Sequence, residues 1–205
     1  MNQLIRKPPQ LSWEVAGSLY VVGVTAYAAV RAVSPQPGET VAVSAAAGGV
    51  GSLVVQLLVL REARVLGIAG NPNADWLRAH GATPIAYGDG LADRLREAAP
   101  NGIDAFIDLF GPDYVHSPLI SVWRPSESTP SSRLRRRAKS APRPRAARRL
   151  RQGKCSAKWP PLVVTGALEF DIAATYPLDR VADAFEELEQ RHTHGKIVLL
   201  PNGSH

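Results

Sequence analysis

The feature that most limits how this chain can fold is a glycine-rich turn at residues 46–51, set directly between two apolar runs. Residues 40–45 form a short, β-branched run of the kind buried in a parallel sheet. Residues 52–58 continue as an apolar helix. Because only the turn separates the two, the helix must begin at the carboxyl end of the strand. This order predicts the first half of a β-α-β unit.

The turn reads Ala46-Ala47-Gly48-Gly49-Val50-Gly51. Gly48 and Gly51 stand at the second and third glycine positions of the dinucleotide-binding fingerprint, and Ala46 stands at the first. A side chain at Gly48 would hold the backbone away from the phosphates, and a small residue at Gly51 lets the helix lie close to the strand. The helix N-terminus would offer N–H groups and partial positive charge to a pyrophosphate. We therefore predict a dinucleotide site, with a purely structural glycine turn as the alternative.

Strands and helices alternate after the turn at the spacing of a parallel sheet with right-handed crossovers. The predicted strands span 63–69, 83–87 and 102–111, and the predicted helices span 74–80 and 91–98. The fold class is therefore α/β, a partial Rossmann doubly wound parallel sheet with strand order 3-2-1-4. A C-terminal strand-helix-strand remnant is expected at 170–176, 178–192 and 195–200. Residues 12–33 predict two helical stretches, with Ser12 as the N-cap.

The end of the second strand bears on the choice between NAD and NADP. An acidic side chain there would bind the ribose 2′-hydroxyl and repel a 2′-phosphate. The chain has Gly70-Asn71-Pro72-Asn73 at this place, and its first acid is Asp75, which we assign to the following helix. The missing acid mildly favours NADP, although no Arg or Lys stands there to bind the phosphate.

Cysteine content and hydropathy narrow the class of protein. Cys155 is the single cysteine, which excludes an internal disulfide and a cysteine-cluster zinc site. No histidine spacing suggests a metal or nucleophile site. We expect no membrane span, since no apolar run is long enough, and no signal peptide. The expected location is therefore cytoplasmic.

The positive charge of the chain is confined to one stretch. Its net charge is +6, yet residues 133–158 hold 12 of the 24 Lys and Arg residues and no Asp or Glu. Outside this stretch, 12 basic residues stand against 18 acidic ones. The stretch could bind nucleic acid or another polyanion with a steep salt dependence. It lacks a recognition-helix pattern, however, and charge runs are more often solvated tails, so we consider a nucleic-acid partner unfavoured.

Residues 116–161 are rich in Arg, Pro, Ser and Ala and show no sustained apolar periodicity. This composition predicts a disordered basic segment, which would leave the fourth strand as an exposed, aggregation-prone sheet edge. One legal coding of 122–132 encodes Val-Ala-Pro-Glu-Arg-Ile-Asn-Thr-Ile-Ile in another frame, a good buried strand. We therefore hypothesise that the segment is a frameshifted translation, restored to frame near Leu162. A genuine basic insert is the alternative.

Taken together, four stretches resemble the zinc-independent medium-chain dehydrogenases/reductases, the quinone-oxidoreductase-like enzymes. The stretches are 11–27, the loop at 43–51, the strand at 102–111 and the closing Gly-Lys-Ile-Val-Leu at 195–199. The resemblance covers about 1–115 and 162–201. It implies hydride transfer from NADPH to a carbonyl, enone or quinone substrate without a metal, and a family-like homodimer.

The resemblance also implies roles for individual residues. Gly48, Gly49 and Val50 would hold the pyrophosphate. Thr25, Phe110 and Gly111 would lie near the nicotinamide. Asn71 and Tyr87 would border the 2′-phosphate, with Lys196 as a further contact. The complete set of expected cofactor-binding residues is Thr25, Ala46, Gly48, Gly49, Val50, Gly51, Gly70, Asn71, Tyr87, Phe110, Gly111 and Lys196.

The resemblance implies an N-terminal GroES-like domain, which supplies most of the substrate pocket in the family, and we expect this chain to lack it. Accordingly we divide it into a helical lead-in at 1–35, a Rossmann half at 36–115, the basic segment at 116–161 and a C-terminal remnant at 162–205. Hydride transfer needs a substrate held against the nicotinamide. We therefore expect impaired activity, with a non-catalytic nucleotide-binding fragment as the alternative, and no catalytic residue is assigned.

Overall fold

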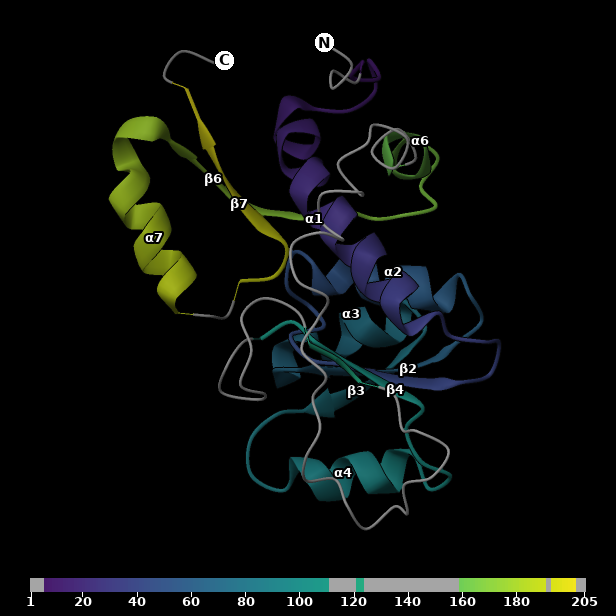
Figure 1. Ribbon diagram of the computed structural model, residues 1–205. Helices are drawn as coiled ribbons and strands as arrows, with labels where there is room; N and C mark the ends of the chain where they lie inside the picture. The colour runs from purple at the N-terminus through teal and green to yellow at the C-terminus, as the bar shows by residue number, and fades with distance from the viewer. Residues whose placement is uncertain (1–5, 111–120, 124–158, 191–192, 202–205) are drawn as a thin grey trace.

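A computed structural model of the chain describes residues 6–110, 121–123, 159–190 and 193–201. Five strands form the larger sheet in the order β3-β2-β1-β4-β5, with helices on both faces (Figure 1). The strands are β1 (Thr40–Val43), β2 (Arg64–Ala69), β3 (Ala82–Ala86), β4 (Ala105–Asp108) and β5 (Ser121–Trp123). The predicted α/β class and the order 3-2-1-4 of the first four strands are confirmed.

The edge of the sheet beyond β4 differs from the prediction. β1 to β4 are parallel, but β5 pairs with β4 in antiparallel register, joining Phe106 to Trp123 and Asp108 to Ser121. The expectation that 116–161 holds no ordered element is therefore wrong for 121–123, and β4 is not the sheet edge. The same expectation is wrong where helix α6 (Trp159–Val164) begins. Residues 124–158, including the basic stretch, lie outside the described part of the chain.

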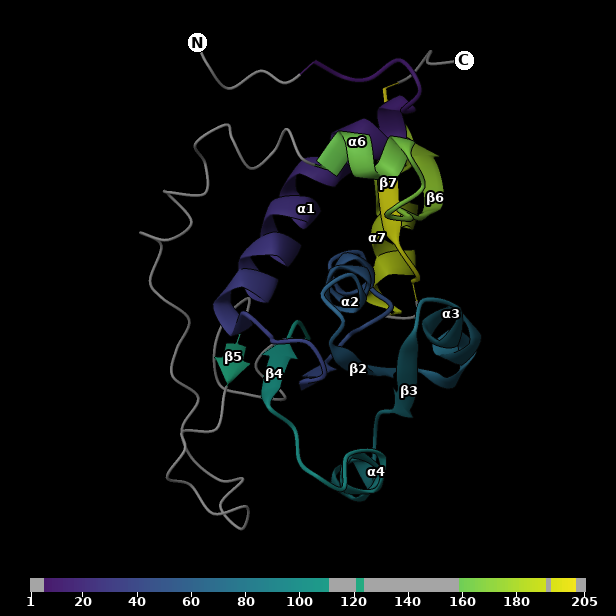
Figure 2. The same ribbon diagram turned by 90° about the vertical axis from the view of Figure 1, so that its right-hand side faces the viewer.

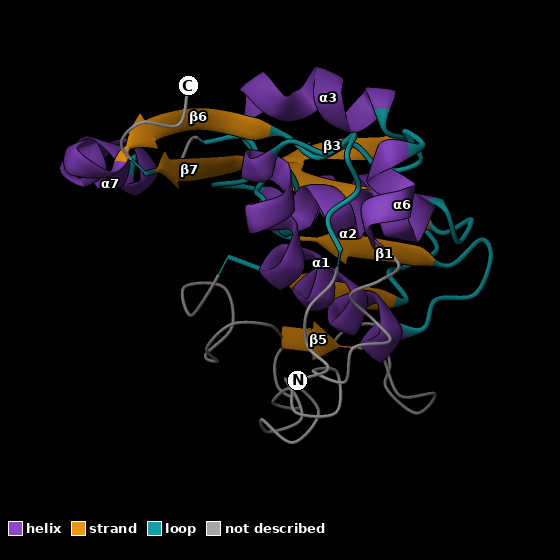
Figure 3. Cartoon of the chain, turned by 90° about the horizontal axis from the view of Figure 1, so that it is seen from above, coloured by secondary structure: helices purple, strands orange, loops and turns teal. Residues whose placement is uncertain are grey.

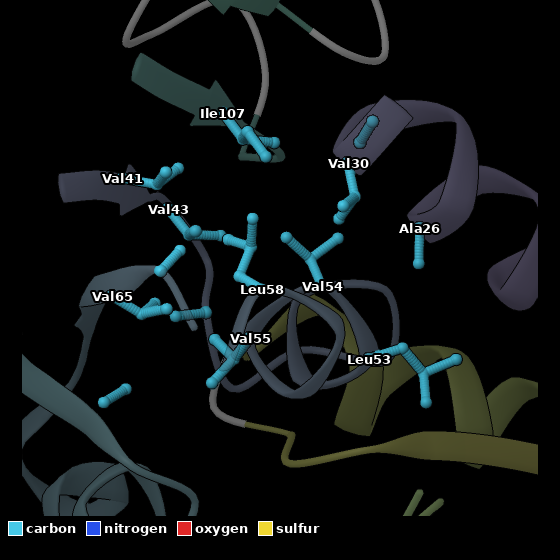
Figure 4. Packing of buried hydrophobic residues seen from close by; sticks show 14 of the residues in the cluster. Ala26, Val30, Val41, Val43, Leu53, Val54, Val55, Leu58, Val65 and Ile107 are labelled. Carbon is cyan, nitrogen blue, oxygen red and sulfur yellow. The ribbon is translucent and has the colours of Figure 1, made fainter. Parts of the chain in front are cut away.

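The core lies mainly between the sheet and helices α1 (Trp13–Val33) and α2 (Gly51–Val59). Figure 4 shows Val54 and Leu58 of α2 pointing toward Val43 of β1 and Ile107 of β4, all of which are fully buried. A smaller cluster on the opposite face places α4 (Leu91–Ala98) against β1, β2 and β3. Helix α3 (Ala74–Ala79) follows a 3-10 turn, η1 (Asn71–Asn73), at the end of β2.

Helix α1 is one continuous helix, whereas the sequence predicted two stretches. It buries a stripe that includes Leu19, Ala26 and Val30, and this packing against α2 outweighs the cost of the two glycines inside the helix. By length and composition α1 could also cross a membrane, contrary to the expectation that no run is long enough. The core helices of soluble proteins satisfy the same criteria, and a third of the most apolar stretch of α1 is buried.

The N-terminus of α1 is capped as the sequence predicts. The Ser12 side chain accepts a hydrogen bond from the Val15 N–H at 3.2 Å. A Ser12 hydrogen bond also lowers the pKa of Glu14 in the first turn. We expect Ser12→Ala to lower the free energy of unfolding by about 1 kcal/mol. Urea denaturation measures this loss, and Ser12→Thr, which keeps the hydroxyl, should remain close to the parent chain.

The C-terminal part is a separate β-α-β unit beside the larger sheet (Figures 2 and 3). Strands β6 (Ile172–Pro177) and β7 (Lys196–Leu200) are parallel, and a 3-10 turn, η3 (Leu178–Arg180), leads from β6 into helix α7 (Val181–Glu189). The predicted helix at 178–192 is thus shorter at both ends, and 191–192 lie outside the described residues. We call β6, α7 and β7 the C-terminal unit.

Specific contacts connect the C-terminal unit to α2 and α3. The Gln56 amide donates to the Glu169 carbonyl at 3.0 Å and accepts from the Glu169 N–H at 2.7 Å. The His80 ring stacks on Trp76 and lies 2.8 Å from the Glu169 carboxylate, while His194 meets the edge of Trp76. These contacts fix the loop before β6 and the turn before β7 against the Rossmann unit.

Candidate functional site

Two glycines of the loop, Gly48 and Gly51, are required for different reasons. A Cβ atom on Gly51 would lie 2.0 Å from the Ala45 carbonyl oxygen, so the fold itself excludes any side chain there. Among the described residues, a Cβ on Gly48 would meet one atom within 4 Å, the same oxygen at 3.3 Å. The protein has nearly enough room for a methyl group at Gly48. The absence of a side chain there therefore suits an approaching ligand more than it serves the packing of the loop.

The helix that follows the loop presents its N-terminus to the site. No side chain caps α2. Within the part of the chain that the structure describes, no hydrogen bond occupies the N–H groups of Val50 and Gly51. Unpaired N–H groups and the positive end of a helix dipole favour a phosphate at this position. The loop thus fits a pyrophosphate by geometry as well as by sequence.

A buried hydrogen-bond network holds the ends of β1 and β4 together below the loop. The Ser44 hydroxyl donates to the Asp108 carboxylate at 2.5 Å and accepts from the Leu109 N–H at 2.8 Å. The Phe110 N–H donates to the same carboxylate oxygen at 3.0 Å. Ser44 and Asp108 are both nearly fully buried. The network fixes where Phe110 leaves the sheet.

A cavity of about 540 Å³ opens beside the loop, at the carboxyl ends of β1, β2 and β3. Its lining residues are Ser44, Ala45, Ala47, Gly48, Ile68, Ala69, Gly70, Asn71, Pro72, Asn73, Ala86, Tyr87, Phe110 and Thr193. Five of the predicted cofactor-binding residues are among them: Gly48, Gly70, Asn71, Tyr87 and Phe110. Ligands of open α/β sheets bind at this edge, where the strand order reverses.

The other predicted residues do not line the cavity. Gly49, Val50 and Gly51 form the rest of the loop, and Ala46 is fully buried beneath it. Thr25 lies in the middle of α1, partly buried, and is not brought to the cavity. Gly111 lies outside the described residues. The role of Thr25 at the nicotinamide stays a prediction.

Lys196, the further contact that the resemblance implies, lies beside the phosphate loop. A Cβ on Gly49 would be 2.5 Å from Lys196 Cδ, so the lysine stem runs across the phosphate loop. The Gly195 N–H donates to the Ala47 carbonyl at 3.4 Å, and Gly48 and Gly195 form a parallel β-bridge. The lysine is absent from the cavity lining that contains Asn71 and Tyr87. Its stem therefore lies against the phosphate loop, and its contact with the cofactor stays a prediction.

Sequence reasoning missed Thr193 as a cavity residue. Thr193 lies three residues before the start of β7, and its buried hydroxyl has no hydrogen-bond partner within the described part of the chain. Only the docking of the C-terminal unit brings it to the cavity, and no local pattern around 193 signals this. In the ranges that the structure covers, no three His, Cys, Asp or Glu side chains gather as metal ligands.

The chain is similar to several reductases of known structure or sequence. It is 39% identical over 103 residues to prostaglandin reductase 1 of Bos taurus, which covers 48% of this chain and 31% of that protein. It is 34% identical over 113 residues to the NADPH-dependent curcumin reductase of Escherichia coli, covering 51% and 31%. The chain thus matches about a third of the length of these curated relatives.

Solved structures extend the likeness to almost the whole chain. The quinone oxidoreductase of Coxiella burnetii superposes with a TM-score of 0.67 at 25% identity, covering 95% of this chain and 63% of that one. The mycobacterial protein Rv1454c in complex with NADPH gives 0.73 at 26% identity, covering 95% and 66%. The family model of the zinc-binding dehydrogenases matches residues 80–199, more than half of the chain. The chain belongs to this family, among the medium-chain dehydrogenases/reductases.

Proposed function

We propose that the chain binds NADPH and serves an oxidoreductase that transfers hydride to a quinone, enone or similar small acceptor. The observation that carries this proposal is the contrast between two glycines of the loop. A side chain on Gly51 would clash with the fold itself, whereas a side chain on Gly48 would mainly obstruct a ligand. The names of the similar reductases support the same cofactor and reaction class.

The described residues offer groups suited to several parts of the cofactor. The N–H groups at the start of α2 and the Lys196 ammonium would hold the pyrophosphate. Asn71 and Tyr87 would border the adenosine ribose, and Phe110 would lie toward the nicotinamide. The bound cofactor would supply the hydride, while the chain orients it and shields one side from water. The Ser44–Asp108 pair would keep Phe110 in place through its backbone N–H.

An oxidation assay tests the catalytic part of the proposal. Purified chain is mixed with NADPH and a soluble quinone, and the loss of NADPH absorbance is followed with and without protein. Protein-dependent oxidation that saturates with quinone is the expected result. If the chain binds NADPH but does not oxidise it, the alternative of a non-catalytic nucleotide-binding chain replaces the reductase.

Lys196 should contribute to cofactor binding through its charge. We expect Lys196→Met, which keeps much of the stem that lies on Gly49, to weaken NADPH binding by about fivefold to tenfold. The loss should diminish at high salt, since it is electrostatic. Arg61→Met is the matched control, because Arg61 is exposed beyond the far end of α2 and its replacement removes the same charge. Equal affinities for the two variants would exclude Lys196 from the site.

A further inference from the structure

The ring of His80 lies between two groups that can only accept a hydrogen bond. Its Nδ1 is 2.9 Å from the Trp76 carbonyl oxygen, and its Nε2 is 2.8 Å from a carboxylate oxygen of Glu169. A carbonyl and an ionised carboxylate have no proton to give. The neutral imidazole carries one N–H and one lone pair, so it can donate to only one of these groups. Only the protonated ring, with an N–H on each nitrogen, donates to both.

His194 offers a contrast, because its ring does not need the second proton. Its Nε2 lies 3.0 Å from the Asp171 carboxylate, and its buried Nδ1 has no hydrogen-bond partner within the described residues. The neutral ring with its proton on Nε2 satisfies this contact, whereas a second proton on Nδ1 would be a buried donor without an acceptor. Both histidines pack on the indole of Trp76, yet their surroundings favour different protonation states.

Among the described residues, Glu169 is the charged group that the His80 ring contacts. Asp75 and Arg78 of α3 pair with each other at 2.7 Å on exposed side chains. β3 carries no ionisable side chain, and α2 reaches Glu169 through the neutral Gln56 amide. His80 is also the C-cap of α3, where the helix end favours positive charge. The other charged or titratable side chains on the neighbouring segments are Arg61, Glu62, Asp171, His194 and Lys196.

The His80–Glu169 contact bears on the phosphate loop through the short segment that follows Glu169. Two residues further on, the Asp171 carbonyl accepts the Lys196 N–H at 3.0 Å. The Lys196 stem lies against Gly49 of the loop. A contact that holds Glu169 on α3 therefore also holds the backbone to which the start of β7 is bonded. Weakening it would loosen the placement of the lysine.

We propose that His80 carries a proton on both ring nitrogens at neutral pH and that its ion pair with Glu169 positions Lys196, so that NADPH binding weakens as the pH rises. The effect on NADPH rests on the proposed function, whereas the protonation of His80 does not. Histidine side chains lose their proton between about pH 5 and pH 8. The ion pair is complete at low pH and is lost as the ring gives up its proton. Because Glu169 is 58% exposed, the effect on affinity is modest, about threefold.

The test uses two measurements on the full chain. NMR of the ¹⁵N-labelled imidazole rings, with His80 assigned through His80→Gln, should show two ring N–H groups on His80 at about pH 7. NADPH dissociation constants are then compared at about pH 6 and about pH 8.5. The parent chain should lose about threefold more affinity over this interval than Glu169→Gln, because a neutral amide can donate to the unprotonated Nε2. His194→Gln is the matched control and should keep the pH dependence of the parent chain.

The possible results separate the inference from the proposed function. A His80 ring with a single N–H at about pH 7 overturns the inference. Equal pH dependence in the parent chain and Glu169→Gln also overturns it, as does loss of the pH dependence in His194→Gln. A folded chain that binds no NADPH at either pH overturns the proposed function, and the NMR measurement then still decides the protonation of His80. The titration of the cofactor itself is common to all variants and cancels in the comparison.

Discussion

Gly51→Ala is expected to destabilise the Rossmann unit by about 3 kcal/mol and to abolish detectable NADPH binding. The added Cβ would lie 2.0 Å from the Ala45 carbonyl oxygen and 2.9 Å from the carbonyl carbons of Ala45 and Ala46. All three atoms belong to the backbone, so no side chain can move aside. Either the loop or the start of α2 must shift, and both form the phosphate site. Urea denaturation and an NADPH titration measure the two losses.

Gly48→Ala is the matched control. It should leave the free energy of unfolding almost unchanged and weaken NADPH binding. Its Cβ would meet one atom, the Ala45 oxygen at 3.3 Å, so the free energy of unfolding should change by less than about 1 kcal/mol. The methyl group would stand where the phosphates approach. We expect NADPH affinity to fall about ten- to hundredfold. Wild-type affinity in Gly48→Ala would mean that the cofactor does not lie over this residue.

Gly195→Ala is expected to weaken NADPH binding at least as much as Lys196→Met, by about tenfold. Gly195 has φ of +86°, a conformation that side chains rarely adopt. A Cβ there would also lie 2.4 Å from the Asp171 carbonyl oxygen, which accepts the Lys196 N–H at 3.0 Å. The turn before β7 must therefore move, and it would take the Lys196 stem away from Gly49.

A second variant and a double variant make this prediction specific. Gly166 also has a positive φ, +73°, but a Cβ there would meet no atom of the described residues within 4 Å. Gly166→Ala should therefore carry a backbone cost of about 1 kcal/mol without changing NADPH affinity. Gly195→Ala combined with Lys196→Met should lose little more affinity than Gly195→Ala alone, since both act through the same ammonium. Fully additive losses would contradict the positioning role of Gly195.

The Rossmann core could be predicted because its signals are local. The β-branched run at β1 and the small residues at Ala46 and Gly51 determine strand, turn and helix over about twenty adjacent residues. Glycine at 51 is required by a backbone oxygen only six residues away, so the sequence pattern carries the constraint. The strand order followed from the doubly wound Rossmann topology that the glycine turn and the alternation of strands and helices indicate.

The parts that could not be predicted depend on contacts between distant segments. β5 is three residues long and lies in a Ser- and Pro-rich stretch. It forms a strand because it pairs with the backbone of β4. Thr193 and Lys196 reach the site only because the C-terminal unit docks at Ala47 and Trp76. The frameshift hypothesis for the basic segment stays a prediction, and reading the coding sequence of codons 110 to 165 in all three frames would test it.

The most direct test of the central claim is a calorimetric titration of the full chain with NADPH, with circular dichroism on the same sample to show that it is folded. The glycine loop, the N–H groups at the start of α2 and the Lys196 ammonium together predict saturable binding of one NADPH per chain, strongly weakened in Gly48→Ala. A folded chain that gives no binding heat at several temperatures, and whose melting temperature NADPH does not raise, would contradict the account.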